Sequence, residues 1–425
     1  MKKSLLAVAA MGAFASAAQA QSSVTVYGIM DVGFAGTTSR TTTSGTTTQP
    51  YVKTNVTGFS GAGSESTSRL GLRGSEDLGG GTSAFFTAEF ALNPTQMNLS
   101  GDANGGLFNR QSFVGLKKNG LGQAAIGTQY TPIHLAVGAT DPGQQNNMIG
   151  SIIYATSSAQ GNAQTTTSYT VRQNQSITAQ SENIAGFVLS GMYVNNNRDA
   201  TQYGAYTSPN AYSAAATTAG GTTNSSGWGL GANYTWNKLY ATAAYQSFIN
   251  STDNNTAVAF LGSVANGLSA LAADPGRSTT GATATNGTGT ATTNGVNIKD
   301  NQFYGAATYD FGILKAYANY INRKAASVIN TDLFASRTGQ QVGVRSFITP
   351  KIEAWANVGQ GRYAAYGNNN PTANFTAYQL GANYILSKRT NMYAIFGSTT
   401  TSSTGAVANN TAGASSYGVG LRHTF

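Results

Sequence analysis

The chain has 425 residues, no cysteine, and 24 basic against 15 acidic residues, which gives a formal net charge of +9. The lack of cysteine excludes disulfides, thiolate nucleophiles, cysteine-ligated metals and a lipoprotein anchor. Only 9% of the residues are charged, against about a quarter in soluble domains, yet a mean hydropathy of −0.19 is too low for a helical membrane protein. Strands with one face toward lipid and the other toward water would produce both values.

The first twenty residues follow the order of a secretory signal. Lys2 and Lys3 precede an apolar stretch from Leu5 to Met11, and Ala18-Gln19-Ala20 provides the small residues of a cleavage site. The apolar stretch is shorter than the roughly 20 residues that a membrane-spanning helix needs. We therefore expect residues 1–20 to be removed on export and residues 21–425 to form a single domain.

Without Lys2 and Lys3 the chain has 22 basic and 15 acidic residues, a net charge of +7. Its basic doublets are isolated: Lys117-Lys118, Arg323-Lys324 and Lys388-Arg389. Nucleic-acid binding requires clustered lysine and arginine. We therefore expect no nucleic-acid partner and place these doublets in solvent, near turns and strand ends.

Apolar and polar residues alternate with a period of two along many segments, which predicts strands. In one predicted hairpin the apolar face carries Trp228, Leu230, Ala232, Tyr234 and Trp236, and then Leu239, Ala241, Ala243 and Tyr245 after a short turn. A second hairpin of this kind runs from Tyr378 to Phe396. Aromatic residues at the ends of such a face are typical of strands that cross an outer membrane.

Seven tight turns separate predicted strands: Glu76 to Gly81, Asn119 to Gly122, Glu182 to Gly186, Trp236 to Lys238, Asp310 to Gly312, Thr349-Pro350, and Ser387 to Arg389. With both chain ends on the turn side, they predict about sixteen strands. The opposite connections are long and polar, as in Thr37 to Gln49 and Asp253 to Asn297. The pattern predicts an all-β fold, a transmembrane antiparallel β-barrel.

The final nine residues form the clearest strand pattern in the chain. One face carries Tyr417, Val419, Leu421, His423 and Phe425, and the other carries Gly418, Gly420, Arg422 and Thr424. A terminal phenylalanine that closes such a strand resembles the signal read by the assembly machinery of outer-membrane barrels. We expect Tyr417, Val419, Leu421 and Phe425 to form this signal.

Longer motifs are spread over the mature chain: Gln21-Ser22-Ser23-Val24-Thr25-Val26-Tyr27-Gly28, Ser68-Arg69-Leu70-Gly71-Leu72-Arg73-Gly74-Ser75-Glu76-Asp77-Leu78-Gly79-Gly80-Gly81, Asn109-Arg110-Gln111-Ser112-Phe113-Val114-Gly115-Leu116, and Tyr384-Ile385-Leu386-Ser387-Lys388-Arg389-Thr390. Together they resemble the general porins of Gram-negative bacteria, particularly the β-proteobacterial branch. The resemblance implies an outer-membrane homotrimer in contact with lipid and lipopolysaccharide. It also implies a water-filled channel for passive diffusion of small hydrophilic solutes and ions, with a third long loop folded into the barrel.

In this family a cluster of arginines on the wall faces the inward loop, and the resemblance carries that role to Arg69, Arg110 and Arg172. Alternation supports the first, because Leu70 and Leu72 occupy the opposite face. Alternation also predicts that Arg110 and Ser112 share one face of their strand and that Phe113 lies on the other. An arginine facing lipid at mid-bilayer would cost roughly 2–4 kcal/mol. We therefore expect all three arginines to face the pore.

The inward loop is expected within Tyr130 to Ser168, where Asp141 is the only carboxylate. The acidic sequence common in this loop of the enteric relatives is missing. On the barrel wall, Thr128 replaces an arginine that the family often has after the glycine of the fifth strand. Three arginines facing about one carboxylate predict a mild anion preference. Glu89 would weaken this preference if alternation places it inward.

Enzymatic activity and cofactors are not expected. The chain has only two histidines, His134 and His423, and no spacing that pairs a nucleophile with a base. Two other interpretations stay open. A substrate-specific porin could use loop residues such as Tyr203, Tyr206 and Tyr212, and a surface adhesin or phage receptor could use the long polar loops.

Overall fold

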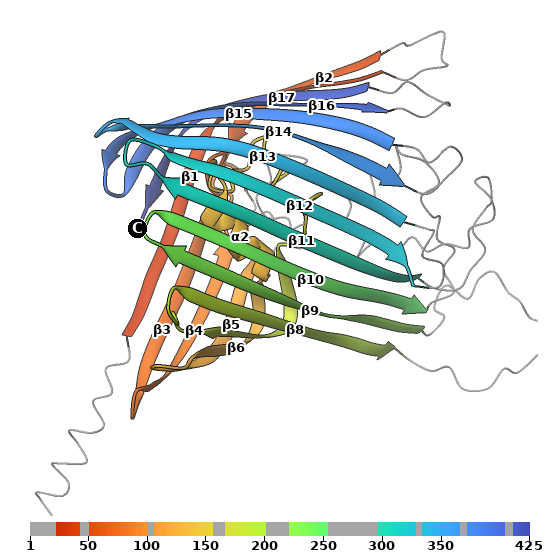
Figure 1. The fold of residues 1–425 in the computed structure, drawn as a ribbon. Coiled ribbons are helices and arrows are strands. Elements are labelled where there is room, and N and C mark those ends of the chain that lie inside the picture. The colour runs from red at the N-terminus through yellow and green to blue at the C-terminus, as the bar shows by residue number, and fades with distance from the viewer. Residues whose placement is uncertain are drawn as a thin grey trace, which may run out of the picture.

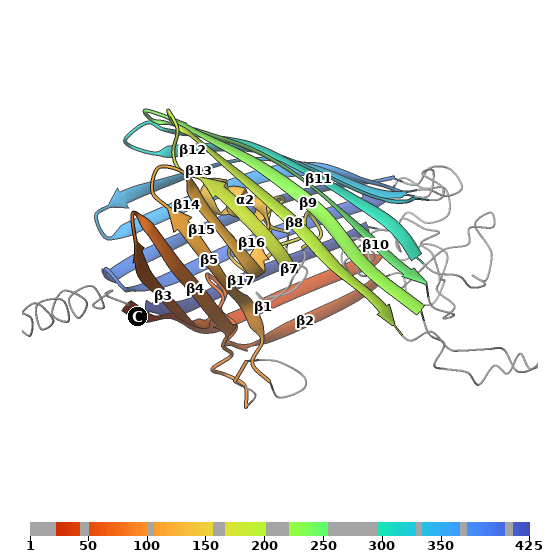
Figure 2. The same ribbon diagram turned by 90° about the horizontal axis from the view of Figure 1, so that it is seen from below.

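The computed structural model describes residues 23–42, 51–97, 99–100, 106–155, 166–200, 221–253, 296–328, 334–365, 372–403 and 411–425. Most of these residues are in antiparallel strands that lie side by side around a ring (Figures 1 and 2). The expected signal at residues 1–20 and the three loop tyrosines at 203, 206 and 212 lie outside the described residues. No helix within these ranges is long and apolar enough to cross a membrane.

Within these ranges the ring consists of β1 (Ser23–Thr42), β2 (Tyr51–Ser60), β3 (Arg69–Gly79), β4 (Thr82–Ala91), β5 (Asn109–Lys118), β6 (Gly122–Tyr130), β7 (Arg172–Ser181), β8 (Phe187–Ala200), β9 (Gly221–Trp236), β10 (Leu239–Asp253), β11 (Val296–Asp310), β12 (Lys315–Ser327), β13 (Phe334–Thr349), β14 (Ile352–Ala365), β15 (Thr372–Ser387), β16 (Thr390–Ser403) and β17 (Thr411–Thr424). β2 and β3 pair with successive parts of β1. They are two halves of one strand that is interrupted at residues 61–68. The described residues therefore form a barrel of sixteen strands, as the predicted turns require.

The last strand closes the ring against the first. β17 pairs with β1 from Thr424 opposite Ile29 to Ala412 opposite Thr41. At the seam, the backbone amide of Gly28 donates to the Phe425 carbonyl at 3.1 Å, and the Phe425 amide donates back at 3.2 Å. A Cβ on residue 28 would lie 2.4 Å from the Phe425 ring, so this glycine makes room for the terminal side chain.

All seven predicted turns join consecutive strands at one end of the barrel (Figure 1). The predicted loop from Thr37 to Gln49 is wrong in its first part, because β1 continues to Thr42 and pairs there with both β2 and β17. A run of threonines is polar enough to read as a loop, but its β-branched residues also suit a strand. The second predicted loop lies largely outside the described residues, which stop at Asp253 and resume at Val296.

Alternate side chains along the strands point out of and into the barrel, as predicted. On β9 the outward residues Trp228, Leu230 and Trp236 are 46%, 58% and 61% exposed. By contrast, Gln246 and Gln379 on the inward faces of β10 and β15 are fully buried. An apolar outer surface around a polar interior is the arrangement of a barrel that sits in lipid.

The segment between β6 and β7 packs on the inward faces of strands far away in the chain. It begins with helix α2 (Pro132–Thr140), where the Thr131 hydroxyl accepts the His134 amide at 3.3 Å. The helix contacts β8 to β12 and lies within the ring in both views (Figures 1 and 2). We call the described residues 131–155 and 166–171 the inner segment; they fall where the sequence predicts the inward loop.

Candidate functional site in the barrel interior

Arg69 on β3, Arg110 on β5 and Arg172 on β7 gather on one side of the interior, and we call them the arginine cluster. Glu89 on β4 lies among them, with Oε1 at 2.8 Å from Nε of Arg110 and 3.8 Å from Nη1 of Arg69. The Tyr27 hydroxyl donates to the other carboxylate oxygen at 3.1 Å. One carboxylate therefore serves at least two guanidinium groups, and the cluster keeps a net positive charge.

Tyr130, at the end of β6, connects the arginine cluster to the inner segment. Its hydroxyl accepts a hydrogen bond from Nη2 of Arg110 at 2.9 Å. The guanidinium carbon of Arg172 lies 5.6 Å from the centroid of the same ring, within the range of a cation–π contact. The His134 ring is 4.3 Å away, between centroids. Tyr130 thus orients two arginines beside helix α2.

Arg110 reaches the interior by a route that alternation did not predict. Phe113 faces inward and packs against Phe85, with ring centroids 6.3 Å apart, whereas Ser112 faces outward beside the exposed Val114. The predicted faces of Ser112 and Phe113 are therefore wrong. A register shift in the β4–β5 pairing, near the end of β4, turns the chain over and brings Arg110 back inside.

Asp141 lies apart from the arginine cluster. Its Oδ2 accepts the Gln145 amide at 2.7 Å, and its Oδ1 accepts from Nε2 of Gln341 on β13 at 3.4 Å. Burial raises the pKa of the Asp141 carboxyl, and its hydrogen bonds together with Arg345 oppose that rise. Helix α2 carries the chain from the end of β6 past strands β8 to β12 before residue 141, which explains the separation.

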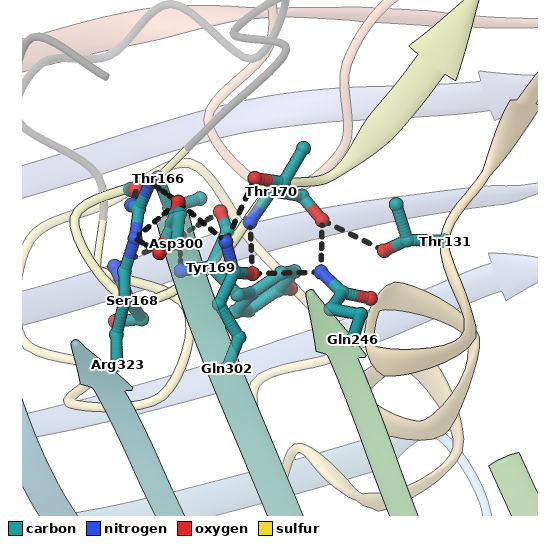
Figure 3. A network of polar contacts seen from close by, with 9 residues as sticks. All are labelled: Thr131, Thr166, Ser168, Tyr169, Thr170, Gln246, Asp300, Gln302 and Arg323. Carbon is teal, nitrogen blue, oxygen red and sulfur yellow. Dashed lines mark hydrogen bonds and ion pairs between the residues drawn. The ribbon is translucent and has the colours of Figure 1, made fainter. Parts of the chain in front are cut away.

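Four buried glutamines on β10, β11, β13 and β15 bind the inner segment, and we call them the glutamine row. In Figure 3, Gln246 and Gln302 converge on Thr170 near the end of the segment. Each member contacts a backbone group of the segment: Gln246 the Thr170 carbonyl at 3.2 Å, Gln302 the Thr170 amide at 2.8 Å, Gln341 the Ile152 amide at 2.8 Å, and Gln379 the Met148 carbonyl at 3.2 Å.

A buried ion pair completes the attachment. Nη2 of Arg323 on β12 lies 2.6 Å from Oδ2 of Asp300 on β11, and its Nη1 donates to the Thr166 carbonyl at 2.8 Å (Figure 3). The predicted solvent position of the doublet Arg323-Lys324 is therefore wrong for the arginine, which is fully buried. Consecutive strand residues point to opposite faces, so a doublet cannot keep both side chains in one environment.

Sequence reasoning also missed Asp31 on β1, Glu65 in the interruption between β2 and β3, and the pair of Arg345 with Glu353. Arg345 Nη2 lies 2.5 Å from Oε2 of Glu353, and Arg345 Nη1 donates to the Pro142 carbonyl at 2.8 Å. Alternation could have placed Asp31, Arg345 and Glu353 inward. No local signal marks Glu65, because its strand is broken there.

The family model of the Gram-negative porins matches residues 7–404. The chain belongs to that family. Porins are channels rather than enzymes, and this porin has the closed barrel of an outer-membrane protein.

Two curated relatives support the assignment over shorter stretches. An outer membrane porin protein of Bordetella pertussis is 39% identical over 144 residues, which are 33% of this porin and 37% of the relative. Outer membrane porin protein 32 of Delftia acidovorans is 40% identical over 136 residues, 31% of this porin and 33% of the relative. The matches thus span little more than a third of either relative.

Solved structures of low sequence identity share the fold over almost the whole chain. The anion-selective porin from Comamonas acidovorans has a TM-score of 0.59 and 20% identity, with 95% of this porin and 100% of that chain covered. OmpT of Vibrio cholerae has a TM-score of 0.57 and 15% identity, with 95% and 98% covered. At identities this low, the likeness shows a shared barrel fold and nothing further.

Proposed function

We propose that this porin is a water-filled channel through which small hydrophilic solutes and ions cross the outer membrane passively, down their gradients. The observation that carries the proposal is the arginine cluster on the inward face of a closed barrel, beside the inner segment. Polar groups that face inward give solutes a hydrated surface. The inner segment occupies part of the cross-section and sets the size limit.

We further infer that the channel prefers anions mildly. The cluster has three guanidinium groups and one carboxylate, that of Glu89, which pairs with Arg69 and Arg110, so the cluster attracts counter-ions of negative charge. In each of the wall pairs Arg323–Asp300 and Arg345–Glu353 the two charges cancel, so these pairs contribute little to the net fixed charge of the interior. The arginine cluster therefore dominates the fixed charge on its side of the interior. The anion-selective porin that shares the fold supports this proposal.

The double variant Arg69→Ser/Arg110→Ser tests the proposal. Purified porin in a planar bilayer with a potassium chloride gradient should show a zero-current potential shifted toward cation preference, because two positive charges are removed and Glu89 is left unpaired. Arg362→Ser, on the exposed outward face of β14, is the matched control and should not shift the potential. An unchanged potential in the double variant would remove both arginines from the selectivity role.

The same recording separates the alternatives. Block of the current by one solute, saturating with its concentration, would identify a substrate-specific channel. A folded barrel that conducts no ions would favour an adhesin or a phage receptor.

A homotrimer is part of the proposal, and the outer surface supports it. Tyrosine and tryptophan anchor a barrel at the two borders of the bilayer. Between residues 52 and 186 the sequence has no tryptophan, and its tyrosines are Tyr130, Tyr154 and Tyr169, which all belong to the site described above. The exposed outward residues there are mainly aliphatic, such as Val114, Leu116 and Ile126, and its exposed aromatic residues, Phe59 and Phe86, are phenylalanines. This arc, β2 to β7, suits contact with other subunits.

Export and assembly complete the proposal: cleavage after Ala20, recognition of the last strand by the barrel assembly machinery, and insertion among lipid and lipopolysaccharide. Val419, Leu421 and Phe425 form an exposed apolar row with Tyr417, as such recognition requires. Phe425→Ala should lower the amount of folded porin in the outer membrane, measured as heat-modifiable mobility in gel electrophoresis. Phe311→Ala, in a turn, is the control. Equal amounts for both variants would exclude the terminal residue as a signal.

A further inference from the structure

The second strand of the barrel is interrupted at residues 61–68, which we call the strand break. Here the chain leaves the sheet after β2 and folds into the interior before β3 begins. Ser64 and Ser68 are fully buried, and Glu65 is 6% exposed. At Gly63, φ is +89° and a Cβ would lie 1.9 Å from the Ser66 carbonyl oxygen, so the turn depends on glycine. The break is a packed part of the interior.

Asp31 on β1 holds the strand break in place. Its Oδ2 accepts the backbone amides of Glu65 at 3.0 Å and Ser66 at 2.6 Å, and its Oδ1 accepts the Tyr393 hydroxyl at 2.6 Å. Its own backbone amide donates to the Ser68 hydroxyl at 2.9 Å. The Asp31 side chain is thus used to shape the break, and its position fixes that of the neighbouring Glu65 side chain.

The Glu65 carboxylate is bound by neutral groups. Nδ2 of Asn383 on β15 donates to Oε1 at 2.7 Å, and Nδ2 of Asn391 on β16 donates to Oε2 at 2.8 Å. These amides solvate the carboxylate without cancelling its charge. Glu89 and Glu353, by comparison, each lie in an ion pair with an arginine. Among the described residues, Glu65 forms no ion pair.

The strand break lies between the arginine cluster and the inner segment. On one side, Nε of Arg69 donates to the Thr67 carbonyl at 2.9 Å. On the other, Asn147 donates from its backbone amide to the Ser64 carbonyl at 2.9 Å and from Nδ2 to the Gly63 carbonyl at 2.9 Å. The Glu65 charge is therefore held near both the arginine cluster and the inner segment, on the side of β15 and β16.

We propose that Glu65 is a determinant of charge selectivity that opposes the arginine cluster, an inference that rests on the channel function proposed above. Because the side chain is buried, it acts through its field rather than by contact with a passing ion. That field extends about 10 Å at 0.1 M salt and about 30 Å at 0.01 M. Its effect on permeability therefore grows as the salt is diluted.

The variant Glu65→Gln removes the charge and keeps the size and most of the hydrogen-bonding capacity. One unit charge about 10 Å from an ion in a water-like dielectric changes the ion's local concentration by about two-fold. Removal of the charge raises the local chloride concentration and lowers that of potassium, each by this factor. We therefore expect the ratio of chloride to potassium permeability to rise by about four-fold in dilute salt and to change little near 1 M. Glu76→Gln, an exposed outward residue of β3, is the control and should leave the ratio unchanged.

The double variant Glu65→Gln/Asn391→Asp moves the carboxylate to the other end of the same hydrogen bond, and should restore the original ratio. An unchanged ratio in folded Glu65→Gln would overturn the inference and leave the channel function standing. Absence of any conductance in the unmodified porin would overturn the channel function itself. If Glu65→Gln does not fold, Asn391→Asp alone decides: the added charge should shift selectivity toward cations, and no shift would reject the inference.

Discussion

The pKa of a single residue, His134, depends on how the interior is packed. Its ring lies among those of Tyr130, Tyr169 and Tyr154, at centroid distances of 4.3, 6.0 and 6.2 Å. Burial, together with the charge of Arg172 and the rest of the arginine cluster, holds the pKa of His134 well below its ordinary value. Gln145 donates to its backbone carbonyl at 3.0 Å. The packed inner segment therefore contains a neutral imidazole.

This lowered pKa predicts the sign of a pH effect. A histidine exposed by detachment of the inner segment would titrate near 6.5. The packed form binds fewer protons, so its stability is complete above that pH and is lost as the pH falls below it. We expect current fluctuations to increase between about pH 7 and about pH 5, and His134→Gln to suppress the increase. His423→Gln, near the C-terminus, is the control; an acid response that persists in His134→Gln would contradict the assignment.

Among the elements, the inner segment depends on the glutamine row more than on its own secondary structure. Gln379 illustrates the point: its Oε1 accepts from Nδ2 of Asn146 at 2.6 Å, and its Nε2 donates to the carbonyls of Met148 and Ile149, both at 3.2 Å. An amide can donate and accept at once, so one side chain satisfies several buried backbone groups. Strands β10 to β15 thus hold a segment that has only one short helix.

Gln379→Ala should loosen the inner segment. Leaving buried polar groups unpaired costs about 1–3 kcal/mol, so we expect a noisier current with a higher mean conductance. Single-channel recording measures both quantities. Gln360→Ala, on the exposed outward face of β14, is the control and should behave like the unmodified porin. A quiet Gln379→Ala channel of unchanged conductance would show that the segment is held by other contacts.

At the scale of the whole molecule, the outer surface divides into two arcs. On β8 to β17 the exposed outward residues include Trp228, Tyr320 and Tyr378, which are of the kinds that anchor barrels at the borders of the lipid. On β2 to β7 the outward residues are mainly aliphatic, and this is the arc that we assign to subunit contacts. A packed subunit interface tolerates extra volume poorly, whereas fluid lipid accepts it.

A pair of matched variants tests the division. Val114 on β5 and Val342 on β13 are both outward, 61% and 57% exposed. Val114→Trp should reduce the trimer fraction, because the indole would collide with a neighbouring subunit. Val342→Trp should leave that fraction unchanged, because it would face lipid. Size-exclusion chromatography with light scattering in detergent measures the fraction; equal trimer fractions in the two variants would place the interface elsewhere.

Local sequence determined most of the strands, the seven turns, the outward and inward faces of the regular strands and the sixteen-strand barrel, because period-two alternation and short turns are properties of neighbouring residues. It also predicted the inward face of Arg69, since the pairing of β3 with β4 is regular from Arg69 onward. Only the tertiary structure decided how Arg110 turns inward after the register shift, and where Asp141 and Glu65 lie. Those positions depend on contacts between residues far apart in the chain, such as Glu65 with Asn391, and no local pattern encodes such contacts.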